Sequence, residues 1–176
     1  MGNLSLTGSF LIGAFVLMTL MLVFFKFTAR QQDMVINELT QSELANIARI
    51  VDYDFDKLGY RVSSNPIISS IDSFSISFLA DLDNNGTVDS VRYFKSTDQQ
   101  GTYLNRRITD PLVKTWRVNI SELLIEGFDS IDGLTYTAAN IRSLAISFVL
   151  NNQRLANDST ENIGSYWRKR FYPLTL

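Results

Sequence analysis

The stretch that decides the fold is FLIGAFVLMTLMLVFFKFTARQQDMVINELTQSELANIARIVDYDFDKLG, residues Phe10 to Gly59. Its first part, Phe10 to Phe25, is apolar all round, and no ionisable side chain occurs from Leu4 to Phe25. A helix needs about 20 residues to cross a hydrocarbon core of ~30 Å. The segment Leu4 to Phe27 therefore has the length and composition of a membrane-crossing helix.

The second part of this stretch is amphipathic and continues the helix. No Pro precedes Pro66, no Gly lies between Gly13 and Gly59, and Gly59 is placed to end a helix. We predict one continuous helix from about residue 5 to residue 58, roughly 80 Å long at ~1.5 Å per residue. It divides the chain into residues 1–28, the apolar half, and residues 29–176, a globular domain that includes the amphipathic half. The apolar residues of the second half recur every three or four positions on one face: Ile36, Leu39, Leu44, Ile47, Val51, Phe55 and Leu58.

Three interpretations of the apolar segment compete: a cleaved secretory signal, a transmembrane anchor and a stalk that packs with other helices. A signal peptide has a basic start, a short apolar stretch and a small-residue cleavage site. This run lacks a basic start and ends in Phe24 and Phe25 before Lys26, so the signal peptide is the least favoured. Lys26 and Arg30 follow the run, and the positive-inside tendency alone would place the C-terminal body in the cytoplasm. The anchor and the stalk both stay open.

Composition excludes several functional classes. Beyond residue 30 the chain has 14 basic and 18 acidic side chains, a net charge of −4 that disfavours nucleic-acid binding. The chain has no Cys and no His, which removes thiolate nucleophiles, disulfides, most zinc sites and the usual proton shuttle. It also lacks the GxSxG, SxxK and Walker motifs. We therefore predict that the protein is not an enzyme and has no catalytic residues.

The chain after residue 60 has the alternating pattern of β-strands. One run contains Phe74, Ile76, Phe78 and Ala80, and the segment SVRYFKS resumes the pattern after a turn. The region Ser121 to Phe128 is predicted as a short helix or a loop, and Asn151 to Gly164 as a mobile connection. A sheet whose apolar face covers the helix stripe makes an α+β domain. Further strands are predicted at Gly101–Ile108, Lys114–Ile120, Leu144–Leu150 and Tyr166–Tyr172.

The turn DLDNNGTVD is a candidate calcium site. Asp81, Asp83, Asn85 and Asp89 alternate in a tight loop with Gly86, and Thr87 offers a backbone carbonyl. Calcium takes six to eight oxygen ligands, and alternate residues of such a loop can converge on one point. An EF-hand is excluded, because its twelfth position requires Glu and Arg92 stands there. A hairpin turn without metal uses the same residue types, so both interpretations stay open.

A second acidic group lies near the end of the predicted helix. Asp52, Asp54 and Asp56 alternate there, and we expect all three on the solvated surface.

Three segments of the body carry a family resemblance. ISFLADLDNNGTVDSVRYF (Ile76 to Phe94) is a strand, an acidic turn and a strand. LLIEGFDSIDGLTYTAANIRSLAISFVL (Leu123 to Leu150) leads through Ile-Arg-Ser into a strand, and RKRFYPLTL (Arg168 to Leu176) has Pro near the end. Together with the long half-apolar helix, these segments resemble the type IV pilin superfamily, in particular PilW-type minor pilins and J-type pseudopilins.

The resemblance implies a type IV pilin-like fold and a structural role in a filament. It implies assembly into a type IV pilus-like filament or a type II secretion pseudopilus, with copies of the chain or other pilins as partners. Before assembly the chain would be located in the cytoplasmic membrane, and it would then enter an extracellular or periplasmic filament. Family members usually have a Glu five residues into the mature chain, whereas no acid precedes Asp33 here. The alternative is a single-pass, extracytoplasmic binding or sensor module that does not polymerise. Candidate assembly residues are Phe10, Leu11, Phe15, Val16, Leu20, Leu22 and Phe24.

Overall fold

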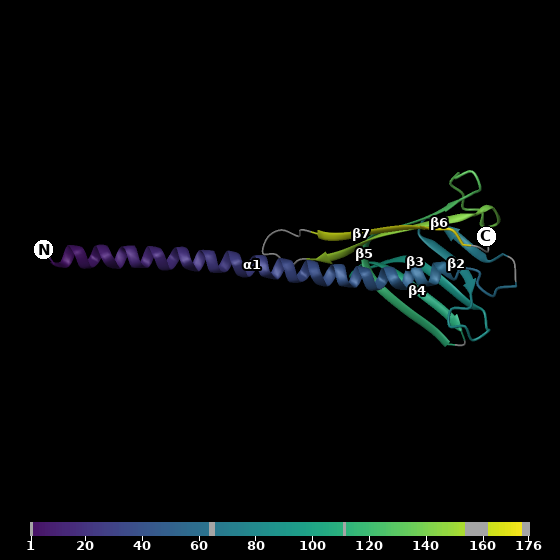
Figure 1. Cartoon of the computed structure of the whole chain (residues 1–176), viewed down its shortest axis with the longest axis horizontal. Helices are drawn as coiled ribbons and strands as arrows, with labels where there is room; N and C mark the ends of the chain where they lie inside the picture. The colour runs from purple at the N-terminus through teal and green to yellow at the C-terminus, as the bar shows by residue number, and fades with distance from the viewer. Residues whose placement is uncertain (1, 64–65, 111, 154–161, 174–176) are drawn as a thin grey trace. The chain divides into compact units, whose positions relative to one another are not determined.

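The computed structural model describes residues 2–63, 66–110, 112–153 and 162–173, and these form a long helix followed by a β-sheet (Figure 1). Helix α1 spans Gly2–Asp56, and a short 3-10 helix, η1, spans Ala138–Asn140. This order confirms the predicted α+β class. The strands are β1 (Ile68–Asp72), β2 (Ser75–Ala80), β3 (Asp89–Asp98), β4 (Gly101–Asp110), β5 (Leu112–Phe128), β6 (Ser143–Gln153) and β7 (Asn162–Phe171).

Helix α1 extends through both compact units of the chain. The first unit is Met1–Leu39 and the second is Thr40–Leu176. The predicted helix, residues 5 to 58, differs from the observed one by a few residues at each end. Gly59 follows with a φ of 76°, a left-handed conformation that glycine adopts without strain, and its amide donates to the Leu79 carbonyl at 2.9 Å. The boundary after residue 28, between the helix half assigned to the membrane or filament core and the globular domain, stays a prediction.

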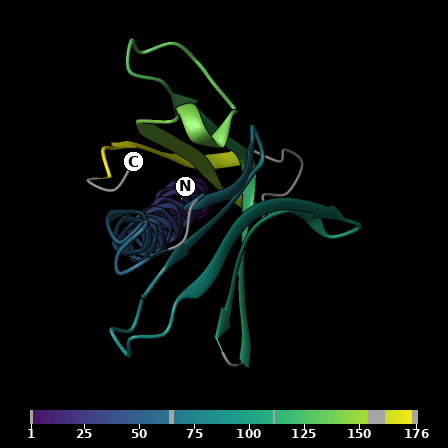
Figure 2. The same cartoon turned by 90° about the vertical axis from the view of Figure 1, so that its right-hand side faces the viewer.

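The sheet is an antiparallel meander in which each strand pairs with the next, in the order β1 to β7. Strand β5 is long enough to serve two neighbours: residues 112–119 pair with β4, and residues 120–128 pair with β6. In its second half, the edge of β5 that does not pair with β6 faces the β1–β2 turn. There the Ile125 amide donates to the Ser73 carbonyl at 2.9 Å. The sheet is consequently curled rather than flat (Figure 2).

The core of the second unit lies between the last turns of α1 and one face of the sheet. Phe55 is central: its ring lies 5.3 Å from Phe78, 5.4 Å from Tyr93 and 5.1 Å from Phe171, measured between centroids. The predicted helix stripe is correct except at Leu39, which is 64% exposed. Ile36 is half-buried, Leu44 is partly buried against the core, and Ile47, Val51, Phe55 and Leu58 are buried in it.

Most strand predictions are confirmed, with three differences. Ser121–Phe128 is neither helix nor loop but the second half of β5. Its alternation was hidden because Leu123 and Ile125 point into the core while Leu124, between them, is also apolar. Strand β1 was missed, since its polar residues give it little pattern. Within the predicted connection Asn151–Gly164, β6 and β7 extend by pairs such as Asn152 with Ile163, and residues 154–161 lie outside the described part.

Candidate functional site

The apolar part of α1 presents side chains on all sides of the helix. Among the described residues one helix is long and apolar enough to cross a bilayer, and its most apolar window is not buried against the rest of the chain. The Thr19 and Thr28 hydroxyls donate to the carbonyls of Val16 and Phe24, at 2.8 and 3.0 Å, so they are satisfied within the helix. The candidate assembly residues Phe10, Leu11, Phe15, Val16, Leu20, Leu22 and Phe24 are between 49% and 77% exposed.

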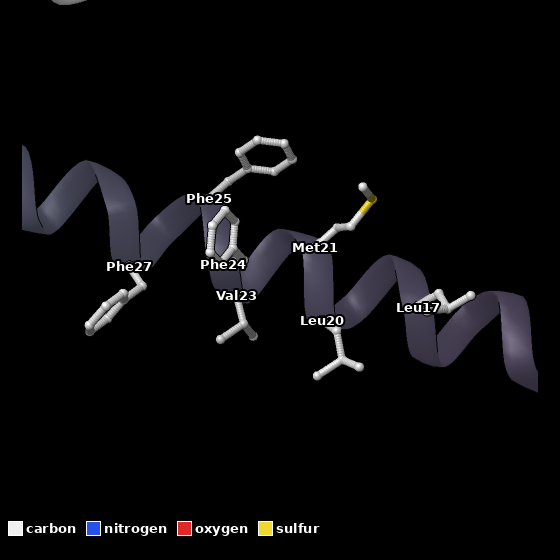
Figure 3. A pocket seen from close by; sticks show the side chains of 7 residues that line it. All are labelled: Leu17, Leu20, Met21, Val23, Phe24, Phe25 and Phe27. Carbon is white, nitrogen blue, oxygen red and sulfur yellow. The ribbon is translucent and has the colours of Figure 1, made fainter.

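A shallow apolar groove runs along this segment, but it is not a ligand pocket. In Figure 3, Met21 and Phe25 point to one side of the ribbon, and Leu20, Val23 and Phe27 point to the other. All the lining side chains come from a single helix, so nothing encloses a small molecule. Its apolar chemistry fits lipid chains or the side chains of another helix.

The acidic loop between β2 and β3 is closed by hydrogen bonds within itself. Asp89 accepts from the Leu82 amide at 2.9 Å, and Asp81 accepts from the Gly86 amide at 3.1 Å. Asp83 accepts from the Asn85 amide at 3.1 Å, and Asn85 in turn accepts from the Thr87 amide at 2.6 Å. Asp81 and Asp89 are buried, whereas Asp83, Asn85 and Thr87 lie at the surface. The predicted ligands therefore form a self-supporting turn.

Two bases just after α1 supply positive charge to the same loop. The Lys57 Nζ donates to the Leu82 carbonyl at 2.6 Å and to the Asn84 Oδ1 at 3.0 Å. The Arg61 guanidinium donates to the Asp81 carboxylate at 3.2 Å. Burial by itself raises the pKa of Asp81, but the bonds from Arg61 and the Gly86 amide outweigh it, so the pKa lies below its ordinary value of 3.8. The sequence pattern did not point to either base.

The described residues contain no group of three carboxylates close enough to hold a metal ion. One observation suits a cation: the Oδ1 atom of Asp81 is buried and has no hydrogen-bond partner among the described residues. The Lys57 ammonium, however, already binds loop oxygens of the kind that calcium would need. Calcium binding by Asp81, Asp83, Asn85, Thr87 and Asp89 stays a prediction.

A buried charge cluster between α1 and the sheet was not predicted. Asp54 is fully buried, not on the solvated surface as expected, and it accepts two hydrogen bonds from Arg106, at 2.5 and 2.7 Å. The Tyr93 hydroxyl donates to the same carboxylate at 2.6 Å. Burial, and then the Asp54 charge, raise the pKa of Tyr93 well above 10.0. Burial alone would lower the pKa of Arg106, but the hydrogen bond to Asp54 more than offsets this effect. The pKa of Arg106 is therefore raised overall, and the guanidinium stays charged.

Comparisons of the chain with protein-family models, curated proteins and solved structures found no match.

Proposed function

We propose that the protein is a structural subunit of a type IV pilus-like or pseudopilus filament. The observation that carries the proposal is the change of character along one helix. From Phe10 to Phe25, α1 is apolar on every side, and from Leu44 to Phe55 one face is buried under a sheet. A helix that is apolar all round must be surrounded by lipid or by other helices. The first part of α1 thus offers a surface for packing in a polymer, and its last turns pack against the sheet.

The proposed mechanism is transfer of the apolar half of α1 from the bilayer into a bundle of equivalent helices. Lipid chains are as apolar as these side chains, so the transfer depends on close packing between helices rather than on the hydrophobic effect. Before assembly the chain would rest in the cytoplasmic membrane with its sheet domain outside the cytoplasm. This orientation opposes the tendency of Lys26 and Arg30 to stay on the cytoplasmic side.

The first test is a charge within the apolar half of α1. Leu20→Asp should abolish the appearance of the full chain in filaments sheared from the cell surface. A carboxylate costs about 2.5–3.5 kcal/mol at the centre of a membrane helix, and a helix bundle gives it no partner. Leu20→Met keeps the volume and apolar character and should assemble normally. Filaments that contain Leu20→Asp in normal amounts would contradict the proposal.

The same shearing assay separates the filament subunit from the alternative function. A single-pass binding or sensor module that does not polymerise stays with the membrane pellet after shearing. A subunit is released with the filament and sediments as a polymer. The wild-type chain found only in the membrane pellet, under conditions in which the cells make filaments, would favour the alternative.

A further inference from the structure

The face of the sheet that points away from the core carries an unusual set of side chains across β2 to β5. Strand alternation and the pairing register place twelve residues there in three rows, which we call the arginine face. These twelve residues include three arginines and no acid; the acids nearest to them on this side of the sheet are Asp98, at the end of β3, and Asp72, which pairs with Ser75. The rows are Leu79, Ser90, Thr109 and Val113; Ser77, Arg92, Arg107 and Thr115; and Ser75, Phe94, Asn105 and Arg117.

Arg92 and Arg107 are direct cross-strand partners at the centre of this face. Like charges in such positions destabilise a sheet. Among the described residues no carboxylate lies within ion-pair distance of either guanidinium. Asp72 acts on Arg92 only through its charge, because its oxygens bind the amides of Phe74 and Ser75. Within the described part of the chain, this arginine pair therefore has no ion-pair partner.

Two of the three guanidiniums lie against aromatic rings, that of Phe94 in the arginine face and that of Tyr103 in the row beside it. The Arg92 guanidinium carbon lies 5.1 Å from the Phe94 ring centre, and that of Arg117 lies 4.3 Å from the Tyr103 ring centre. Such stacking orders the arginine side chain while its N–H groups remain able to bind oxyanions. Arg117 also reaches the Asp98 carboxylate at 3.4 Å, where both side chains are largely exposed. The face is thus a preordered array of donors for closely spaced carboxylates.

We propose that the arginine face binds an acidic surface of a second copy of this chain. The inference rests on the proposed filament function, because a helical polymer brings different faces of identical subunits together. With the three face arginines set aside, the chain beyond residue 30 keeps 11 basic and 18 acidic side chains, so another copy offers the complementary charge. A nucleic acid fits less well. The net charge of −4 beyond residue 30 repels a polyanion, and arginines already cover the rings on which bases would stack.

The test places a photoreactive benzophenone side chain at Thr115, which is exposed and directly opposite Arg107. The full chain is irradiated in cells and recovered from sheared filaments. We expect a product of two copies, with the attached peptide containing Asp or Glu. Arg92→Glu combined with Arg107→Glu should lower its yield about tenfold or more, because like charges across an interface cost several kcal/mol. The control, Arg49→Glu with Lys114→Glu, makes the same charge change at exposed residues outside the face and should leave the yield unchanged.

The outcomes separate this inference from the filament proposal. If the wild-type chain never appears in sheared filaments, the proposed function fails. If filaments form but the product is a nucleic acid or a different protein, or if the two double variants behave alike, the arginine face is not a contact between copies. Arg92→Gln with Arg107→Gln guards against misfolding. It should also lower the yield while the unfolding midpoint, followed by Trp fluorescence, does not fall below that of the wild type.

Discussion

At the scale of single residues, Asp54 joins α1 to two strands, because it binds Tyr93 of β3 and Arg106 of β4. We expect Asp54→Asn to destabilise the second unit by about 3–5 kcal/mol, since it leaves the guanidinium of Arg106 without its counter-charge in a mostly buried position. Chemical unfolding of the full chain in detergent, followed by Trp fluorescence, measures the change.

The matched control for Asp54 lies two residues earlier. Asp52 pairs with Lys169 at 3.1 Å, but both side chains are more than a third exposed. Exposed ion pairs contribute about 0–1 kcal/mol, so Asp52→Asn should have little effect. Equal losses from the two substitutions would contradict the structural role assigned to the buried cluster.

Tyr93 makes the same cluster sensitive to alkali. Its pKa is raised in the folded chain, so its contribution to stability is complete below the ordinary pKa of 10.0 and is lost as the pH rises from there toward the folded value. The wild-type free energy of unfolding should therefore fall above pH 10, by up to about 1.4 kcal/mol per pH unit from this group. Tyr93→Phe should remove that part of the slope. Identical slopes for the two proteins, measured between pH 9 and 11, would show that Tyr93 ionises freely.

The burial of Asp54 was accessible from the sequence, whereas its partners were not. Asp54 lies three residues after Val51 and four before Leu58, so helical periodicity places it on the buried face. The same periodicity places Asp52 and Asp56 on the face of the helix that points away from the core. The identity of Arg106 and Tyr93 depends on the pairing register of β3 with β4, which no local pattern fixes.

At the scale of elements, Gly127 allows β5 to lie close to the segment that follows it. A Cβ added at Gly127 would lie 2.5 Å from the Thr135 carbonyl oxygen, and the Thr135 amide donates to the Gly127 carbonyl at 2.8 Å. We expect Gly127→Ala to cost about 1–3 kcal/mol, as overpacking does. Gly13→Ala is the control, because a Cβ there meets no atom within 4 Å and alanine favours a helix. Equal unfolding midpoints for the two variants would refute the close approach.

The acidic loop is an element with two candidate cations, Lys57 and calcium. If the Lys57 ammonium closes the loop, the melting temperature of the full chain should be the same in calcium and in EDTA, and Lys57→Met should lower it in both. Calcium bound only by the folded chain would instead raise the melting temperature as its concentration rises. The geometry favours the first outcome. A calcium-dependent increase that Asp83→Asn abolishes would establish the metal site.

Alternating sequence patterns located a strand correctly where one face of the strand is exposed to solvent. They were misleading where both faces are apolar. The alternation of serines with Ile76 and Phe78 placed β2 correctly. In the second half of β5, Leu123, Leu124 and Ile125 follow one another, so the period of two disappears. A strand that changes partners midway, as β5 does, also has no local signature, because the change is a property of the sheet.

At the scale of the whole molecule, the two compact units depend on different surroundings. From Thr40 onward the helix is stabilised by its own core, through residues such as Ile47 and Val51. From Thr7 to Phe25 the proposed surroundings are lipid or other helices. In the stretch between them, residues 26–39, the apolar side chains of Met34, Val35 and Leu39 are largely exposed. A helical stretch that buries few of its apolar side chains gains little stability from packing, and short helices are only marginally stable in water.

Residues 26–39 should therefore be the part of α1 that opens most readily before assembly. In lipid nanodiscs that hold single copies, we expect their amides to exchange with deuterium about tenfold faster or more than those of residues 40–56, whose opening requires loss of the core. In sheared filaments neighbouring helices would cover the same stretch and remove the difference. Hydrogen exchange followed by mass spectrometry measures both states. Equal protection in nanodiscs would show that the helix is stable without neighbours, and unchanged exchange in filaments would show that polymer packing ends before Lys26.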